Sequence, residues 1–123
     1  MRVLVADYDT GSCLSLTSMI RDQGMRADWT NYGREALVRA DEAINSGDPF
    51  GAYIINSMMS DIDGIETVVS LRNIVGDEIP VIMMTARDQS DIKNKSSDAG
   101  VTVCITKPLQ ASELADIFDD NLR

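Results

Sequence analysis

The sequence predicts an α/β fold in which five parallel strands form a doubly wound sheet covered by five helices. Two observations lead to this fold class. Short apolar runs alternate along the chain with segments whose apolar residues recur at helical spacing. The chain also ends on such a helical segment, and parallel neighbours need right-handed crossover connections, which the helices supply. Strands buried on both faces have continuous apolar sequences, so the apolar runs are placed in the sheet.

Five segments are expected to be strands. Four of them are apolar runs of five or six residues: RVLVA (2–6), GAYIIN (51–56), PVIMM (80–84) and VTVCI (101–105). The fifth, MRADWT (25–30), is less apolar and is more typical of an edge strand.

Helices are indicated between the strands by apolar residues at helical spacing. The four clearest patterns are Leu14, Leu16, Met19 and Ile20; Ala36, Leu37, Ala40 and Ile44; Ile65, Val68, Val69 and Leu71; and Leu114, Ile117 and Phe118. The polar segment 88–98, with Ile92 at its centre, predicts a further helix that is exposed and loosely held. Gly24 follows the first helical pattern and Gly100 follows the polar segment 88–98, at positions where a left-handed residue commonly ends a helix.

Composition excludes several functional classes. The formal charge of −9 would repel a phosphate backbone, so no nucleic-acid binding is expected. The absence of histidine removes the commonest general base and metal ligand. Cys13 and Cys104 are too few for a disulfide scaffold or a thiolate zinc site, and are expected to be buried, reduced thiols. No apolar run approaches the roughly 20 residues of a membrane span, so a cytoplasmic domain without membrane contact is expected.

Ligands of doubly wound sheets bind outside the carboxyl ends of the strands. Here those ends carry Asp7, Asn56, Thr85-Ala86 and Thr106-Lys107-Pro108. Together with the segment NSMMSDIDG (56–64), these residues resemble the receiver domain of two-component response regulators, which has a flavodoxin-like fold. The resemblance runs from about Arg2 to Phe118, and residues 1–123 are expected to form one receiver-like domain.

The resemblance implies a phospho-acceptor position that is altered in this chain. A receiver accepts a phosphoryl group on an aspartate with the help of a divalent cation, a lysine and a hydroxyl. Asn56 stands at the acceptor position, and an amide can form hydrogen bonds but should not accept phosphate. Tyr8 replaces the second acid of the metal-binding pair and leaves only Asp7, so Mg²⁺ binding is expected to be weak or absent. Asp9 is expected to point elsewhere because successive residues leaving a strand alternate in direction.

The remaining site positions also depart from the receiver pattern. Cys104 stands where a receiver has an aromatic switch residue, two positions before Thr106, and Ser60 stands where proline is usual. Thr85, Lys107 and Pro108 are retained. A structural role for the retained residues is also open, with Lys107 paired to Asp7, Asn56 bonded to either of them, and Thr85 acting as a capping hydroxyl. Met58, Met59, Met83 and Met84 are expected to pack in the core.

These observations favour a receiver-like signalling module that is not phosphorylated, is not an enzyme and acts by contacts between proteins. The expected partner is a histidine kinase or another two-component protein, contacted through the fourth helix, fifth strand and fifth helix. The loop INSGDPFGAY (44–53) resembles that of receivers in hybrid sensor histidine kinases, with a stand-alone single-domain regulator as the alternative. Two rival functions stay open: phosphorylation at Ser57 or Ser60, and a flavodoxin-type small-molecule site with DTGSC (9–13) as its phosphate loop. The sequence leaves the oligomeric state open.

Overall fold

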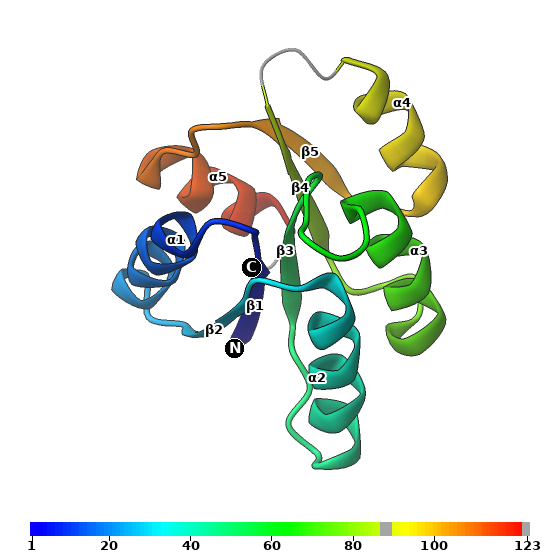
Figure 1. Ribbon diagram of the computed structural model, residues 1–123. Helices are drawn as coiled ribbons and strands as arrows, with labels where there is room; N and C mark the ends of the chain where they lie inside the picture. The colour runs from blue at the N-terminus through cyan, green and yellow to red at the C-terminus, as the bar shows by residue number, and fades with distance from the viewer. Residues whose placement is uncertain (87–89, 122–123) are drawn as a thin grey trace.

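The predicted fold class is confirmed by the computed structural model, which describes the backbone of residues 1–86 and 90–121 and the side chains of 1–86 and 94–121. Five parallel strands form one sheet in the order β2-β1-β3-β4-β5 (Figure 1). The strands are β1 (Arg2–Ala6), β2 (Arg26–Thr30), β3 (Ala52–Asn56), β4 (Val81–Thr85) and β5 (Val103–Thr106). Each begins within two residues of its predicted start, and the less apolar segment β2 is an edge strand, as expected.

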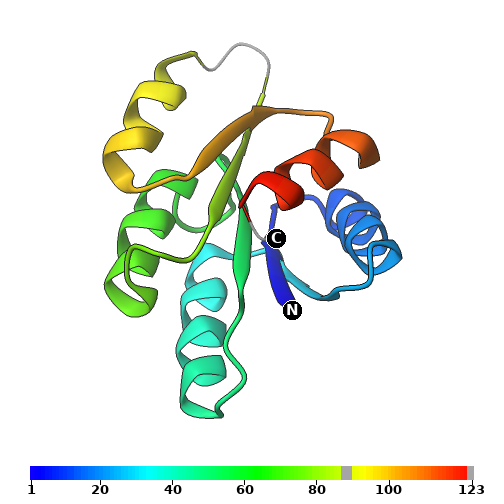
Figure 2. The same ribbon diagram turned by 180° about the vertical axis from the view of Figure 1, so that it is seen from behind.

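Helices cover both faces of the sheet. They are α1 (Thr10–Asp22), α2 (Gly33–Asn45), α3 (Gly64–Val75), α4 (Ser90–Ala99) and α5 (Ala111–Asn121). Helices α1 and α5 lie on one face, whereas α2, α3 and α4 lie on the other (Figures 1 and 2). No helix in the described part of the chain combines the length and apolar character needed to cross a bilayer.

Alternation along the strands divides the core between the two faces. On β1, Val3 and Val5 pack in the cluster that contains Leu16, Ile20 and the α5 residues Leu114 and Phe118. The intervening residues of β1, Leu4 and Ala6, pack with the buried residues of α2 and α3. Strands β1, β3 and β4 are therefore buried on both faces, which explains their continuous apolar sequences.

Met58 and Cys104 are less buried than predicted, and some of the apolar residues that indicated helices lie on the surface. Leu14, Ile44 and Val69 are 54%, 41% and 47% exposed, because they lie on the outer flank of their helices, beside the buried stripe. Met58 is also exposed, because it follows β3 in a loop instead of lying on the strand; Met83 and Met84 are buried as predicted. Cys104 is half-buried like the rest of β5, which is the second edge strand of the sheet.

Two of the predicted helix ends depend on left-handed glycines. Gly24 has φ +86° and Gly100 has φ +101°, at the ends of α1 and α4. The predicted segment 88–98 contains most of α4, but residues 88 and 89 and the side chain of Ile92 lie outside the described part of the chain. Gly64 is required for a different reason: a Cβ there would lie 2.3 Å from the backbone oxygen of Asn56. A side chain at position 64 would therefore push the start of α3 away from the end of β3.

Candidate functional site at the carboxyl edge of the sheet

The ends of β1, β3 and β5 bring Asp7, Asn56 and Lys107 together. The Asp7 side chain is completely buried, and its Oδ2 lies 2.6 Å from Nζ of Lys107. The Lys107 side chain is 26% exposed, so its ammonium group reaches the carboxylate from the rim of the site. A buried carboxylate without a partner is strongly destabilising, and this ion pair provides the compensating charge.

Asn56 uses its amide nitrogen as a donor toward both sides of the site. Its Nδ2 donates to Oδ1 of Asp7 at 3.3 Å and to the backbone oxygen of Met58 at 2.8 Å. The side chain is buried, being only 3% exposed. Both acceptors would face an oxygen if the residue were an aspartate, so this arrangement requires an amide.

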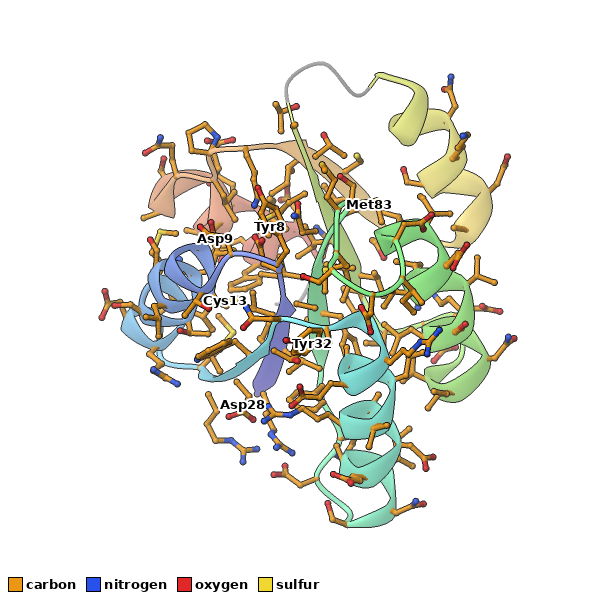
Figure 3. All side chains as sticks on the ribbon, in the orientation of Figure 1. Tyr8, Asp9, Cys13, Asp28, Tyr32 and Met83 are labelled. Carbon is orange, nitrogen blue, oxygen red and sulfur yellow. The ribbon has the colours of Figure 1, made fainter. Side chains whose placement is uncertain are left out.

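Tyr8 and Asp9 follow Asp7 in the loop between β1 and α1 (Figure 3). Tyr8 is 54% exposed, and the Lys107 ammonium lies 5.7 Å from the centre of its ring, within the range of a cation–π contact. Asp9 is the N-cap of α1, and its Oδ2 accepts hydrogen bonds from the Ser12 hydroxyl at 2.9 Å and the Ser12 amide at 3.1 Å. These bonds lower the pKa of the Asp9 carboxyl, and the bond from the Ser12 hydroxyl has the largest effect. The carboxylate of Asp9 therefore caps the N-terminus of α1.

The oxygen atoms around Asp7 do not fit a magnesium site. Mg²⁺ is usually held by one or two carboxylates that are free to bind it, in octahedral geometry. Oδ1 of Asp7 accepts from the Asp9 amide at 3.0 Å as well as from Asn56, and Oδ2 accepts from Lys107. Within the described residues no group of three or more aspartate, glutamate, cysteine or histidine side chains could hold a metal ion.

Thr85 and Cys104 lie on the last two strands of the sheet, β4 and β5. The Thr85 hydroxyl is buried and donates to the backbone oxygen of Ile105 at 3.3 Å, so within the described residues it links β4 to β5. Cys104 packs against the cluster on the α2 and α3 side of the sheet. Lys107 and Pro108 are joined by a cis peptide bond.

The two serines proposed as alternative acceptors and the remaining cysteine lie close to this edge. Both serines lie between β3 and α3: Ser57 directly follows β3 and is buried, whereas Ser60 is exposed. Cys13 is a buried free thiol that donates to the backbone oxygen of Asp7 at 3.5 Å. Burial, with a contribution from the Asp7 charge, raises the pKa of Cys13 to about 11, so the thiol stays protonated at neutral pH.

Asp61, in the loop between β3 and α3, has a role that was not predicted from the sequence. Its Oδ1 and Oδ2 accept hydrogen bonds from the amides of Gly33 at 2.9 Å and Arg34 at 3.0 Å, at the start of α2. The N-cap residue of α2, Tyr32, makes no side-chain capping bond, so Asp61 supplies the cap from another loop. Desolvation acts to raise the pKa of Asp61, but backbone hydrogen bonds outweigh it and the pKa is lowered. The absence of a capping side chain before α2 was the only sequence signal for this contact.

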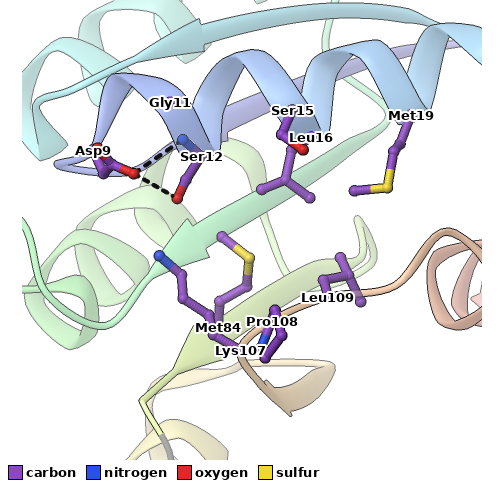
Figure 4. A pocket seen from close by; sticks show the side chains of 10 residues that line it. All are labelled: Asp9, Gly11, Ser12, Ser15, Leu16, Met19, Met84, Lys107, Pro108 and Leu109. Atoms are coloured by element: carbon purple, nitrogen blue, oxygen red, sulfur yellow. Dashed lines mark hydrogen bonds between the residues drawn. The ribbon is translucent and has the colours of Figure 1, made fainter.

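A pocket of about 320 Å³ lies beside Lys107, between α1 and the segment that follows β5 (Figure 4). Leu16, Met19, Met84 and Leu109 contribute its apolar lining, and Asp9 lies at one end, bonded to Ser12. The predicted phosphate loop DTGSC overlaps this region. However, the lining holds one carboxylate, Asp9, and one ammonium group, Lys107, so it offers no net positive charge to a phosphate.

Comparisons with known proteins agree with the geometry. The model of the response regulator receiver domain family matches residues 3–119. Response regulator MprA of Mycolicibacterium vanbaalenii is 33% identical over 114 residues, which is 93% of this chain and 47% of the relative. The transcriptional regulatory protein ZraR of Klebsiella oxytoca is 30% identical over 112 residues, 91% of this chain and 24% of the relative. The chain thus spans at most about half the length of these curated relatives.

Solved structures show the same fold. The chemotaxis protein CheY4 of Vibrio cholerae superposes with a TM-score of 0.88 at 24% identity, with 98% of each chain covered. The receiver domain of the Francisella response regulator 1452 superposes with a TM-score of 0.81 at 28% identity, covering 97% of this chain and 93% of that one.

Proposed function

This chain belongs to the response regulator receiver domain family, and from that premise we propose that it is a receiver that works without phosphorylation, through contacts with other two-component proteins. The observation that carries the proposal is the Asn56 amide, which donates to both Asp7 and the Met58 carbonyl at the position where the family pattern has the acceptor aspartate. The lone pair of an amide nitrogen is delocalised into the carbonyl. Asn56 therefore lacks the charged nucleophile that acyl-phosphate formation requires.

The charges of the site support the same proposal. The carboxylate of Asp7 and the ammonium of Lys107 form a 2.6 Å pair whose formal charge is −1 + 1 = 0. A phosphoryl group would need positive charge to stabilise it, and the available lysine is already paired to a buried acid. We predict that Mg²⁺ binds weakly or not at all, and that the chain catalyses no reaction of its own.

The proposed partner is a histidine kinase or another protein of a two-component system, bound through the surface of α4, β5 and α5. Two parent architectures fit the sequence: a hybrid sensor histidine kinase, suggested by the loop at 44–53, and a response regulator, the class named by the matched relatives. A cytoplasmic location, expected from the sequence, stays a prediction.

Intact-mass spectrometry after incubation with Mg²⁺ and acetyl phosphate tests the proposal directly. The wild type should gain no phosphoryl mass. The double variant Tyr8→Asp/Asn56→Asp restores the acid at both altered positions and serves as the positive control for the donor. Phosphorylation of the wild type would overturn the proposal.

The same experiment addresses the rival acceptors. If the wild type gains mass, fragmentation of the modified peptide assigns it, and removal of the signal by Ser57→Ala or Ser60→Ala would establish a serine acceptor. Ser57 and Ser60 lack the histidine that would act as the commonest activating base, because the sequence contains none. We therefore expect neither serine to be modified.

A further inference from the structure

Strand β2 lies at one edge of the sheet, where it pairs with β1 on one side. The Arg26 amide donates to the Met1 oxygen at 2.9 Å, and the Thr30 oxygen accepts from the Asp7 amide at 3.1 Å. Backbone groups alternate in direction along a strand, so the N–H and C=O groups of Ala27 and Trp29 point away from β1. These outward groups form the free edge of β2.

Two arginine side chains occupy this edge. Nη2 of Arg21, from α1, donates to the oxygen of Ala27 at 2.8 Å. Nη1 of Arg39, from α2, donates to the oxygen of Trp29 at 3.3 Å. The two helices cover opposite faces of the sheet, so one guanidinium reaches the edge from each face (Figure 1). Both outward carbonyls of β2 therefore meet a guanidinium group.

Arg39 is held in place by a second residue that is tied to the same strand. Its Nε lies 3.3 Å from Oε1 of Glu35, one helical turn earlier. Oε2 of Glu35 in turn accepts from the Thr30 hydroxyl at 2.8 Å. A pocket of about 410 Å³ lies beside the strand, and its lining includes both arginines, Glu35 and Trp29 as well as Asp28 and Tyr32. The edge of β2 is thus reachable from solvent, and the two arginines donate to the backbone oxygens of Ala27 and Trp29 that face outward from it.

We propose that Arg21 and Arg39 close the β2 edge against strand pairing, and that the partner they exclude is a second copy of this chain. An added strand would lie about 4.8 Å away, and its amide nitrogens would need the positions that the guanidinium nitrogens now fill. A second copy fits this edge because a two-fold axis through Asp28 would pair Ala27 of each strand with Trp29 of the other. Asp28, which such an axis would bring opposite itself, is neutralised by Arg2 at 3.0 Å.

The test compares the double variant Arg21→Ala/Arg39→Ala with wild type by sedimentation equilibrium over a wide range of protein concentration. We expect the variant to self-associate at least about tenfold more tightly than wild type. The matched control Arg34→Ala/Lys95→Ala removes the same charge from exposed positions of α2 and α4 and should behave like wild type. Adding Ala27→Pro to the first variant removes an outward N–H, which an edge strand tolerates, and should abolish the new association.

Three results would overturn the proposal: no gain in association, an equal gain in the control, or a gain that survives Ala27→Pro. If circular dichroism shows that the alanine variant does not fold, Arg21→Met/Arg39→Met replaces it. Methionine keeps an apolar stem against the sheet while removing every donor, so the same three outcomes apply.

Discussion

Replacing Asn56 by aspartate should destabilise the protein even though it restores the residue expected of a receiver. In the wild type, Nδ2 donates to the Met58 oxygen at 2.8 Å and to Oδ1 of Asp7 at 3.3 Å. A carboxylate cannot donate either bond at neutral pH, so two hydrogen bonds become two contacts between acceptors. The loss of two buried hydrogen bonds reduces the free energy of unfolding by about 1–3 kcal/mol.

Charge repulsion adds to this loss. Two unit charges about 4 Å apart interact by about 4 kcal/mol at an effective dielectric constant near 20, and attraction between the new carboxylate and Lys107 offsets much of that. The expected net decrease in the free energy of unfolding is about 2–4 kcal/mol at pH 7. The deficit should shrink as the pH is lowered, because protonation of the new carboxyl ends the repulsion.

Urea unfolding in the presence of a chelator measures the effect, with fluorescence of the single tryptophan, the half-buried Trp29, as the probe. Asn94→Asp introduces the same charge at an exposed position of α4 and should stay within about 0.5 kcal/mol of wild type. If Asn56→Asp matches this control, the two amide hydrogen bonds are not part of what stabilises the site, and the argument for a locked receiver fails.

Four further variants probe the same edge of the sheet. Lys107→Met should lower the free energy of unfolding by about 3–5 kcal/mol, measured in urea, because it leaves the buried Asp7 carboxylate without its ion pair. Asp61→Ala should lower it by about 1 kcal/mol through loss of the α2 cap. The pKa of Asp61 is lowered on folding, so the charged carboxylate adds to the free energy of unfolding above the unfolded pKa of about 3.9. This contribution is lost as the pH falls below that value. The unfolding midpoints of Asp61→Asn and wild type should therefore converge below about pH 4. Tyr8→Asp/Asn56→Asp should show Mg²⁺ binding by calorimetry under conditions where wild type shows none, and equal heats for the two proteins would contradict our assignment of the metal loss to these positions.

The sequence was sufficient for the fold because its local patterns agree with one another. The apolar runs predicted the strands, and Gly24 and Gly100 predicted the ends of α1 and α4. Ligands of such sheets bind at the carboxyl ends of the strands, and this led to Asp7, Asn56 and Lys107, which the structure brings together. The contacts of Asp61 could not be predicted in the same way. Its capping of α2 joins two loops whose relative position depends on the packing of α2 against α3. Exposed Met58 was mistaken for a core residue because an apolar residue next to a strand has the same local pattern as one inside it.

The altered site can be understood as one that reaches charge balance without a cation. Carboxylates at positions 7, 8 and 56 with one lysine would sum to −3 + 1 = −2, a charge that a divalent ion would neutralise. With Tyr8 and Asn56 in place, the sum over the same four positions is −1 + 1 = 0. The two replacements also make contacts of their own, since Asn56 donates to the Met58 oxygen and the Tyr8 ring lies near the Lys107 ammonium. The contacts of Asp7, Asn56 and Lys107 thus tie the ends of β1, β3 and β5 together in a single charge state, as the proposed function requires.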